Sequence, residues 1–505
     1  MRSFLTDLRA RPEALLVALL LAAHAAHWHY TVDDAYISFR YAKNFVEGNG
    51  LVYNPGERVE GYTNFLWVAL LAGPMAAGVD PLVVSKALGL ASGGILTLLV
   101  VADVGKRLGR WVGFAAGTAL AADPAFALWT TAGLETPLFI LLAYLAIRSL
   151  LDDPPAISPL CGVWAGLAAL TRPEGVIVLA AALATALARR AAGSAPRALL
   201  LFAVIVVPHL AFRFVYYHDL LPNTFYAKVG GGLAAWPRGA RYLGDWLFRY
   251  GAGLLVLLAL IGAPSRRLLA ALVAALLFAA YVVAVGGDGL SMFRFALFLS
   301  VPVTLLAAEG AARAARRFGG AGGPAAAALL LIALALPARN AFAGPYRAFV
   351  VEDRARVELH WVQIGKWLAR HADPARDLVA LPVAGAIAYY GGIPAIDMLG
   401  ITDRHIAHAF VPHPGKGIAG HEKHDMPYVL SRKPTFFIHY PFLIKDPSTP
   451  FTTSQFDTEW NPGLAALRTD PVFDKEYRGE VAEVRIPGAP RLYYFAFFRR
   501  RVGSR

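Results

Sequence analysis

Two adjacent carboxylates, Asp33 and Asp34, stand directly after the first apolar stretch of the sequence, where the chain would leave a membrane. Residues 35–45 continue with the apolar spacing of an amphipathic helix, and an aromatic, glycine-rich loop follows. A carboxylate in a partly desolvated pocket has a raised proton affinity, which suits it to take a proton from a hydroxyl group. Solvated loop carboxylates are the alternative interpretation. We expect one of the two to be a catalytic base, with Asp33 ahead of Asp34.

Three hydrogen-bonding side chains follow in the segment VEGYTNFLW, namely Glu60, Tyr62 and Asn64. Beside the carboxylates they would suit the hydroxyl groups of a sugar ring. The same segment can be interpreted as the start of an interfacial helix, with Thr63 or Asn64 as its N-terminal cap and aromatic side chains at headgroup depth. The two interpretations are compatible.

Three cations stand beside the ends of apolar runs: Arg172 in LTRPEG, Lys228 in LPNTFYAK and Arg294 in GGDGLSMFRF. Ionisable groups at such places are costly unless they are used. A cation there would neutralise a lipid phosphate and stabilise it as a leaving group. The alternatives are a surface ion pair of Arg172 with Glu174, and snorkelling of Lys228 and Arg294 to lipid headgroups. The remaining candidates for substrate contact are Tyr36, Arg40, Glu135, Glu174, Asn223, Tyr226 and Asp288.

Several other catalytic signatures are missing from the sequence. It contains no nucleotide-phosphate loop, GxSxG, HExxH or CxxC motif. The histidines of HEKHD, His421 and His424, show no convergent ligand pattern, so loop polarity explains them better than a metal site. The one cysteine, Cys161, cannot form an intramolecular disulfide. No cofactor is identified, and the need for a divalent cation stays open.

The composition is typical of a polytopic membrane protein. The 505 residues are 57% hydrophobic and 16% charged, and the apolar residues gather in long runs. A net charge of +13 is better explained by positively charged cytoplasmic loops than by nucleic-acid binding. We interpret eleven runs as crossings, several of them short. They cover residues 14–30, 83–104, 112–130, 137–151, 160–170, 175–188, 198–217, 251–263, 268–285, 295–312 and 324–341.

One further apolar segment, Phe65–Val79, decides the side of every later loop. It contains Gly73 and Pro74 and is shorter than the roughly 20 residues that a span needs, so we interpret it as an interfacial helix. The amino terminus and the basic clusters at 106–110, 189–197, 266–267 and 313–317 then lie in the cytoplasm, as the positive-inside rule requires. The loops that carry the candidate residues face outward. We expect the first apolar run to be a retained signal anchor rather than a cleaved signal peptide.

The character of the chain changes after Ala341. Charge density rises, and DLVALPVAGAIAYYGGIPAIDMLGI indicates short strands and a helix joined by glycine and proline turns. Residues 356–371 have helical apolar spacing. We therefore expect two domains: a membrane domain of about 11 spans at 1–341, with an outer loop at 31–82, and a soluble α/β domain on the outer face at 342–505.

The order of these motifs resembles a known family. A leading span, then DDAYISFRYAKNFVEGNGLVYNPGERVEGYTNFLW, then GLET, LTRPEG, LPNTFYAK and GGD…FRF between spans are similar to the terminal arabinofuranosyltransferases of actinobacterial cell-wall synthesis and their wider bacterial relatives. Those proteins belong to the GT-C class of membrane glycosyltransferases. The segments GAIAYYGGIPAIDMLGITDRHIA and GHEKHDMPYVLSRKPTFFI also resemble the carboxy-terminal domain of that group, so the resemblance covers most of the chain.

The resemblance implies a polyprenyl-phosphate-linked sugar as donor and a cell-envelope glycan or glycolipid as acceptor. It also implies inverting transfer on the outer face of the bacterial inner membrane, with the base at Asp33 and Asp34 next to it. Arabinofuranose is the leading expectation for the sugar, although some relatives are known only through flagellar motor effects. A transporter, or a non-catalytic sensor or scaffold with an outer binding domain, are the alternatives. A transporter usually carries ionisable groups within its spans, often in repeated halves, and a sensor would not need the paired carboxylates.

Overall fold

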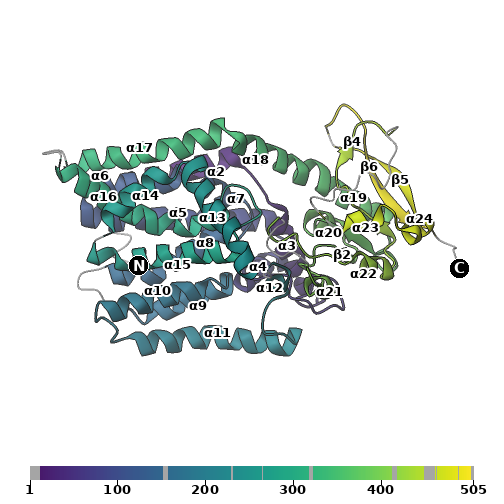
Figure 1. The fold of residues 1–505 in the computed structure, drawn as a ribbon, viewed down its shortest axis with the longest axis horizontal. Coiled ribbons are helices and arrows are strands. Elements are labelled where there is room, and N and C mark those ends of the chain that lie inside the picture. Colours follow the sequence, from purple (N-terminus) through teal and green to yellow (C-terminus); the bar gives the residue numbers. More distant parts are fainter. Residues whose placement is uncertain are drawn as a thin grey trace.

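The chain folds into a long helical bundle with a smaller α/β domain at one end, as the computed structural model shows (Figure 1). The structure describes residues 12–501 apart from 152–156, 229–230, 264, 318–321, 412–417, 448–460, 462 and 487. The long helices of the bundle run side by side, and the strands that are described all lie in the α/β domain.

The carboxylate pair lies at a sharp bend between two helices. The first, α2 (Pro12–Trp28), is followed after a short break by α3 (Asp33–Val46), and the two axes differ by 99°. Asp33 and Asp34 therefore form the first turn of a helix, where a negative charge is favourable. Helix α3 packs against α4 (Phe65–Ala76), a 12-residue helix within the apolar segment 65–79. Its interfacial position stays a prediction.

The rest of the bundle consists of α-helices joined by short turns. Two of them begin with an aspartate cap and a proline in the first turn: Asp80 accepts from the amide of Leu82, and Asp123 from the amide of Phe126. The helices are α5 (Pro81–Leu108), α6 (Arg110–Ala121), α7 (Pro124–Thr131), α8 (Thr136–Arg148), α9 (Leu160–Thr171), α10 (Gly175–Ala188), α11 (Ala195–Tyr217), α12 (Asn223–Lys228), α13 (Trp236–Gly244), α14 (Gly253–Gly262), α15 (Leu269–Val285), α16 (Ser300–Arg317) and α17 (Gly322–Ala343). Shorter 3-10 or π segments are η1 (Ser149–Leu151), η2 (Gly232–Ala235), η3 (Asp245–Tyr250), η4 (Arg266–Leu268) and η5 (Arg294–Leu299).

Small residues set how closely the helices approach. Where α14 and α16 cross, a Cβ on Gly262 would collide with the carbonyl oxygen of Leu306, and one on Gly310 with that of Leu258. Close backbone approach through small residues is a common way for helices to associate in a membrane. The abundance of glycine in the apolar runs thus has a packing function here.

Five described helices are long and apolar enough to cross a membrane, or up to eight crossings if each bent pair of helices counts as one. The bent pairs are α2 with α3, α6 with α7, and residues 232–250 with α14; shorter apolar helices are α4, α8 with η1, α9 and α10. The chain is therefore a polytopic helical membrane protein, as the composition predicted. The number of eleven crossings stays a prediction.

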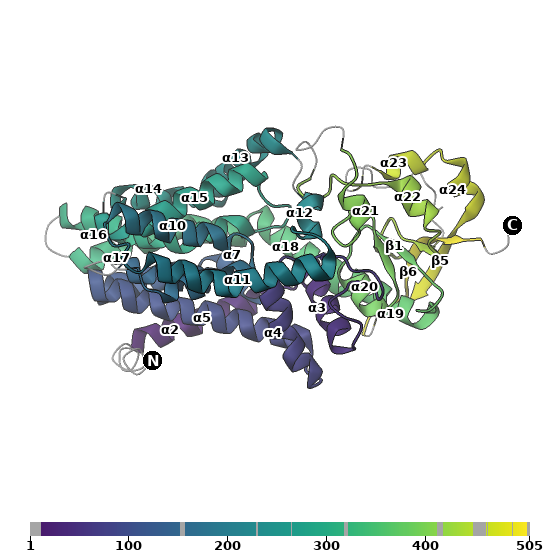
Figure 2. The same ribbon diagram turned by 90° about the horizontal axis from the view of Figure 1, so that it is seen from below.

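A run of consecutive helices connects the bundle to the α/β domain. Helix α17 leads into α18 (Pro345–Ala355), the π-helix η6 (Arg356–Trp361) and α19 (Val362–His371), which the spacing of residues 356–371 predicted to be helical. Figure 2 shows these helices leaving the bundle and ending beside the sheet. The boundary between the domains at residue 342 is not tested by this arrangement, because the helices continue across it.

The α/β domain is built on a mixed sheet with strand order β2-β1-β3-β6-β4, and β5 also pairs with β6. Strand β1 is parallel to β2 and β3, while β6 is antiparallel to its three neighbours. The strands are β1 (Val379–Leu381), β2 (Ala395–Asp397), β3 (Phe436–Phe437), β4 (Leu443–Ile444), β5 (Tyr477–Val484) and β6 (Tyr493–Arg500). The helices are α20 (Ala386–Gly391), α21 (Arg404–Ala407), α22 (Met426–Ser431), α23 (Leu464–Leu467) and α24 (Pro471–Glu476).

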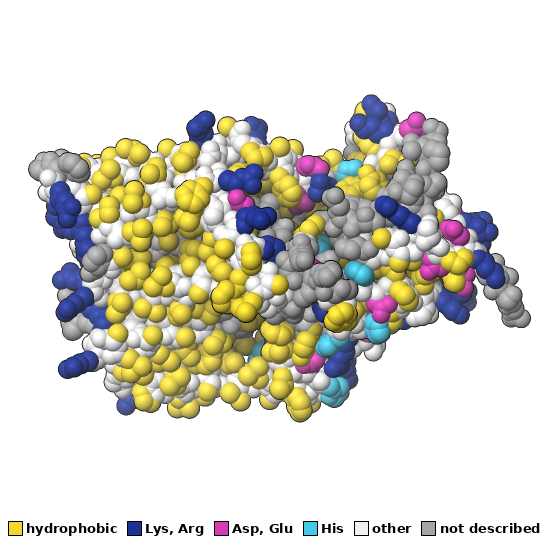
Figure 3. Space-filling view, viewed as in Figure 1, with side chains coloured by type: hydrophobic (Ala, Val, Ile, Leu, Met, Phe, Trp, Pro, Cys, Tyr) yellow, Lys and Arg dark blue, Asp and Glu magenta, His cyan; other side chains and the backbone are white. Residues whose placement is uncertain are grey.

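The surface separates apolar and charged side chains. Figure 3 shows hydrophobic side chains along the flank of the bundle, and Lys and Arg side chains at the end far from the α/β domain. Acidic and histidine side chains on the same face gather toward the domain. This distribution agrees with a bundle that sits in lipid between two aqueous phases.

Candidate active site

A cavity of about 100 Å³ lies where the end of the bundle meets the α/β domain. One wall comes from the start of α3, from α12 and from the turn before η5; the other comes from α18, η6 and three loops of the domain, at 382–384, 397–401 and 419–421. We call it the polar cavity. Its titratable lining side chains are Asp33, Asp34, Lys228, Asp288, Asp353, Asp397 and His421.

Asp33 is held by backbone amides from the α/β domain. Its Oδ2 accepts a hydrogen bond from the amide of Gly385 (2.9 Å), and its Oδ1 accepts one from the amide of Ala386 (2.8 Å). Burial raises the pKa of Asp33 to about 7; the nearby charges of Asp34 and Asp353 add to this shift, while the two amides oppose it. Each oxygen keeps a second lone pair, so an oriented carboxylate can still accept a proton near neutral pH.

Asp34 and Lys228 are the side chains that the protein leaves available in the polar cavity. Asp34 accepts no hydrogen bond from any described residue, and Lys228 forms no ion pair within the described part of the chain. Lys228 is exposed and packs beside Gly420. The cavity therefore offers both an acceptor and a cation to a ligand.

Arg294 is paired rather than free. Its guanidinium donates to both oxygens of Asp288, at 2.8 and 3.2 Å, and lies over the rings of Trp129 and Phe295. The residue is buried, so it does not snorkel to headgroups. Asp288 lines the polar cavity, which puts the ion pair directly behind the cavity wall.

Arg172 lies at the centre of a buried polar network. It donates to Glu135 (2.5 Å) and to Glu174 (2.9 Å), and Tyr281 donates to the same oxygen of Glu174. The ion pair with Glu174 that the sequence suggested is present, but it is buried rather than at the surface. Arg172 Nε and Glu174 Oε2 find no hydrogen-bond partner among the described residues. An arginine between two carboxylates compensates their charge inside the bundle.

The same network corrects the capping interpretation of Asn64. Asn64 occupies the cap position of α4, but neither it nor any other side chain donates or accepts a capping bond there. Instead its amide donates to Glu135 (2.8 Å) and to the hydroxyl of Ser38 (3.0 Å). The side-chain oxygen of Asn64, which would accept a capping bond, instead accepts from the hydroxyl of Ser38 at 3.4 Å. Asn64 therefore ties α3 and α4 to the start of α8.

The other predicted substrate contacts are engaged by the protein itself. Arg40 donates to the backbone carbonyls of Tyr53, Ala388 and Ile393. Glu60 forms a two-bond ion pair with Arg213. The structure does not bring these residues into the polar cavity, and the same holds for Tyr36, Tyr62, Asn223 and Tyr226. Tyr36 contacts the tilted rings of Tyr389 and Tyr390, and Tyr62 is hydrogen-bonded to Tyr217. Asn223 donates to the carbonyls of residues 400, 401 and 403, and Tyr226 donates to Asp219.

Sequence reasoning missed the wall contributed by the connecting helices and the α/β domain. Asp353, Trp361, Asp397 and His421 all line the polar cavity. Trp361 is buried on the π-helix η6, a distortion that often marks functional sites, and its indole N–H has no hydrogen-bond partner among the described residues. The sequence carries no local pattern that would have identified these residues, because nothing around residue 353 or 397 indicates that they lie near residue 33.

Metal ligands do not converge in the part of the chain that is described. No three His, Cys, Asp or Glu side chains there lie close enough together to hold an ion.

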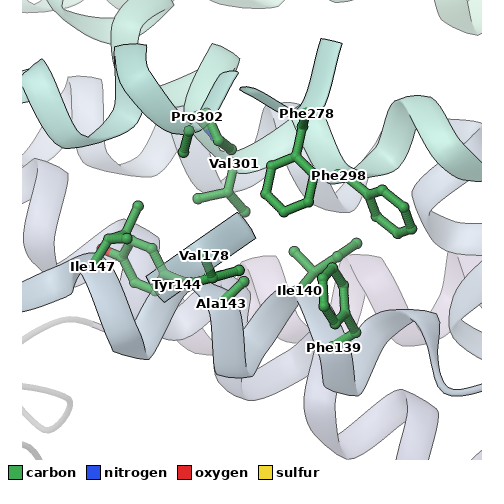
Figure 4. Close-up of a pocket in the computed structure, with 11 residues that line it drawn as sticks. Phe139, Ile140, Ala143, Tyr144, Ile147, Val178, Phe278, Phe298, Val301 and Pro302 are labelled. Carbon is green, nitrogen blue, oxygen red and sulfur yellow. The ribbon is translucent and has the colours of Figure 1, made fainter. Parts of the chain in front are cut away.

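A second cavity, of about 20 Å³, lies inside the bundle and is entirely apolar in its side chains apart from a tyrosine hydroxyl (Figure 4). Its lining residues come from α8, α10, α15, η5 and α16: Phe139, Ile140, Ala143, Tyr144, Ile147, Val178, Ala274, Phe278, Phe298, Val301 and Pro302. We call it the apolar cavity. Phe298 belongs to its wall and also lies 5.1 Å from the Arg172 guanidinium, so the buried network borders this cavity.

The fold defines the class of protein. Two solved structures of ArnT from Cupriavidus metallidurans, one bound to undecaprenyl phosphate and one in the apo state, match with TM-scores of 0.54 and 0.50. Sequence identity is 14% in both, and each match covers 76% of this chain and 85% of that chain. A family model described as dolichyl-phosphate-mannose-protein mannosyltransferase matches residues 85–212. The chain has a GT-C glycosyltransferase fold, which confirms the class that its motifs resemble.

A particular curated relative matches over a shorter region. The terminal β-(1→2)-arabinofuranosyltransferase of Mycobacterium tuberculosis is 30% identical over an alignment of 253 residues, and the match covers 46% of this chain and 40% of the relative. The match thus spans less than half the length of that protein. A second family model, described as a domain of unknown function (DUF8728), matches residues 348–485, in the region of the α/β domain.

Proposed function

We propose that the protein is a GT-C glycosyltransferase that moves a sugar from a polyprenyl-phosphate donor to a glycan or glycolipid acceptor in the polar cavity. The observation that carries the proposal is the pair Asp33 and Asp34 at the membrane end of a GT-C fold, with Lys228, a cation that has no ion-pair partner among the described residues, in the same cavity. The ArnT structure with undecaprenyl phosphate and the arabinofuranosyltransferase relative support this donor class. Arabinofuranose is the sugar that we propose first.

Asp33 acts as the base in the proposed reaction. Its carboxylate takes the proton of an acceptor hydroxyl, the hydroxyl oxygen forms a bond to the anomeric carbon, and the bond from that carbon to the phosphate oxygen breaks. The configuration inverts, and the electron pair leaves on the lipid phosphate. A pKa of about 7 leaves Asp33 sufficiently ionised and sufficiently basic near neutral pH. Asp34, which accepts no hydrogen bond from the described residues, would hold a sugar hydroxyl.

Lys228 would contact the donor phosphate directly, because it is the lysine of the polar cavity and has no ion-pair partner in the described structure. Arg294 and Arg172 would add positive charge from behind the cavity wall, each moderated by its carboxylate partners. The apolar cavity beside Arg172 would take part of the prenyl chain. Exclusion of water from such a site limits hydrolysis of the donor.

The proposed location is the bacterial inner membrane, with eleven crossings and with the polar cavity and the α/β domain outside the cytoplasm. The gathering of Lys and Arg at the opposite end of the bundle supports this orientation (Figure 3). A reporter fused after Leu82 should be extracytoplasmic. A cytoplasmic reporter at that position would reverse the orientation of every later loop.

The decisive experiment is sugar transfer by purified protein in nanodiscs from a panel of synthetic polyprenyl-phosphoryl sugars. Wild type is compared with Asp33→Asn and Asp34→Asn, and donor binding and thermal unfolding are measured for each. We expect Asp33→Asn to lower kcat by about 10³-fold, since general-base catalysis contributes about 10²- to 10⁴-fold. Asp34→Asn should mainly raise the KM of the substrate whose sugar hydroxyl Asp34 holds.

Two results would contradict the proposal. Transfer that is undiminished in Asp33→Asn would remove Asp33 as the base, and loss of transfer in Asp34→Asn alone would move that role to Asp34. No transfer by wild type from any donor of a broad panel would favour the transporter or sensor alternatives instead.

A further inference from the structure

The α/β domain contacts the carboxylate of Asp33 through two backbone amides. The two amides of Gly385 and Ala386 each donate to a different oxygen of Asp33, so the plane of the carboxylate is fixed. A Cβ added to Gly385 would lie 2.5 Å from Cγ and Oδ2 of Asp33, and closer still to its backbone oxygen. Real Cβ atoms do not approach other atoms so closely, so only glycine permits this contact.

The segment that carries these amides is hydrogen-bonded on both sides of Gly385 to α3 and to the loop after α3. Tyr53 donates its hydroxyl to the carbonyl of Ala384 at 2.6 Å. Arg40 donates to the carbonyls of Ala388 and Ile393, and Asn54 exchanges two hydrogen bonds with the backbone of Ala395. Residues 384–395 are thus fixed against the part of the bundle that carries Asp33.

We propose that Gly385 is a positioning residue: with the amide of Ala386 it forms a cradle, supplied by the α/β domain, that orients the carboxylate of Asp33 toward the polar cavity. Through the cradle, the α/β domain contributes two hydrogen-bond donors to the catalytic centre. The catalytic consequence rests on the proposed transfer function, whereas the orientation and ionisation of Asp33 do not.

The cradle also favours the ionised carboxylate, because both amides donate to it. Loss of the cradle should therefore raise the proton affinity of Asp33. The other titratable groups that face Asp33 or line the same cavity are not substituted in this comparison. They are Tyr30, Asp34, Tyr36, Tyr53, Lys228, Asp288, Asp353, Asp397 and His421.

The test compares Gly385→Ala with Gly391→Ala in the full-length protein in nanodiscs. Gly391 ends the same short helix, and a Cβ there would meet Leu368 at 3.5 Å, an ordinary van der Waals distance. Gly385→Ala should lower kcat by about 10²-fold or more, since a misplacement of about 1 Å costs that much. The KM for the donor should stay within about twofold, and Gly391→Ala should match wild type.

A second readout needs no transfer activity. A carbodiimide reacts with protonated carboxyl groups, so labelling of Asp33 against pH, followed by peptide mass spectrometry, reports its titration. The labelling midpoint of Gly385→Ala should rise by about one pH unit, because hydrogen bonds to a charged group are worth about that much. The midpoint of Gly391→Ala should not move.

A milder variant covers the case in which Gly385→Ala does not fold. Tyr53→Phe removes the hydroxyl that holds the Ala384 carbonyl and should produce both effects at smaller size, with kcat lower by roughly three- to tenfold. The proposal would be overturned if Gly385→Ala changes neither the labelling midpoint of Asp33 nor kcat. If Gly385→Ala does not fold, the same result in Tyr53→Phe would overturn it. If wild type transfers no sugar, the labelling midpoints decide the positioning role by themselves.

Discussion

The polar cavity and the apolar cavity differ in almost every property. The polar cavity is about 100 Å³, lies between two domains and has seven titratable side chains in its wall. The apolar cavity is about 20 Å³, lies within one bundle and has no charged side chain in its wall. Arg172 and its two glutamates stand beside Phe298 at the edge of the apolar cavity. The charges closest to the apolar cavity are therefore compensated by one another, because Arg172 is paired with Glu135 and Glu174.

The largest expected effect is on stability, and it concerns the buried ion pairs of Arg172 with Glu135 and Glu174. Arg172→Met leaves Glu135 and Glu174 buried without their cation, and we expect a loss of about 3–5 kcal/mol in the free energy of unfolding. Unfolding in detergent, followed by tryptophan fluorescence, measures the loss. The triple variant Arg172→Met, Glu135→Gln, Glu174→Gln should recover most of the lost stability. If it does not, Arg172 stabilises the protein by something other than charge compensation.

A smaller effect should separate the roles of the two cavities. Ala143→Phe fills the apolar cavity and should raise the KM of long-chain prenyl donors about tenfold, equal to about 1.4 kcal/mol, while short-chain donors are unaffected. Leu187→Phe, on the exposed side of α10, is the control. Equal effects on long and short donors would argue against a chain-binding role for this cavity.

The cation of the polar cavity should act more weakly, because Lys228 is exposed to water. Lys228→Gln should raise the KM of the donor by roughly three- to fivefold and leave the free energy of unfolding within about 0.5 kcal/mol of wild type. The rise should diminish at high salt, since screening weakens exposed charges. Lys475→Gln, on α24, is the matched control. Loss of stability without a change in KM would make Lys228 a structural residue.

The smallest expected effect is a shift in pH dependence. The base must be ionised, so kcat/KM should fall as pH drops through the pKa of Asp33, near 7. The charge of Asp34 raises that pKa, and Asp34→Asn should therefore move the acidic limb to lower pH, by less than about one unit. Profiles of the residual activity at constant ionic strength measure it. A shift to higher pH would mean that Asp34 stabilises the ionised form of Asp33.

Local pattern predicted many of the elements. Apolar periodicity gave bundle helices and the strand–helix–strand order of residues 379–397. Asp33 and Asp34, which the sequence placed just after the first apolar run, line the polar cavity. These features depend on residues close together in the chain. They are the features that a single sequence carries most directly.

The partners of the polar side chains could not be predicted in the same way. Arg40, Glu60 and Asn223 have the residue types of ligand contacts, yet they bind backbone carbonyls or an arginine of the protein. A buried polar group must find some partner, and the sequence does not tell whether that partner is a ligand or the chain itself. The wall formed by Asp353, Trp361 and Asp397 depends on how two domains meet, which no local pattern encodes.

The hydrogen bond from Gly385 to Asp33 joins residues that are 352 positions apart, and this separation has a consequence for biogenesis. During synthesis at about 5–20 residues per second, roughly 20 to 70 seconds pass between the two residues leaving the ribosome. Throughout that interval the first helices are present while the carboxylate has no cradle. The centre is therefore completed among the last steps of folding, and a chain interrupted before residue 385 leaves a membrane protein with an unoriented Asp33.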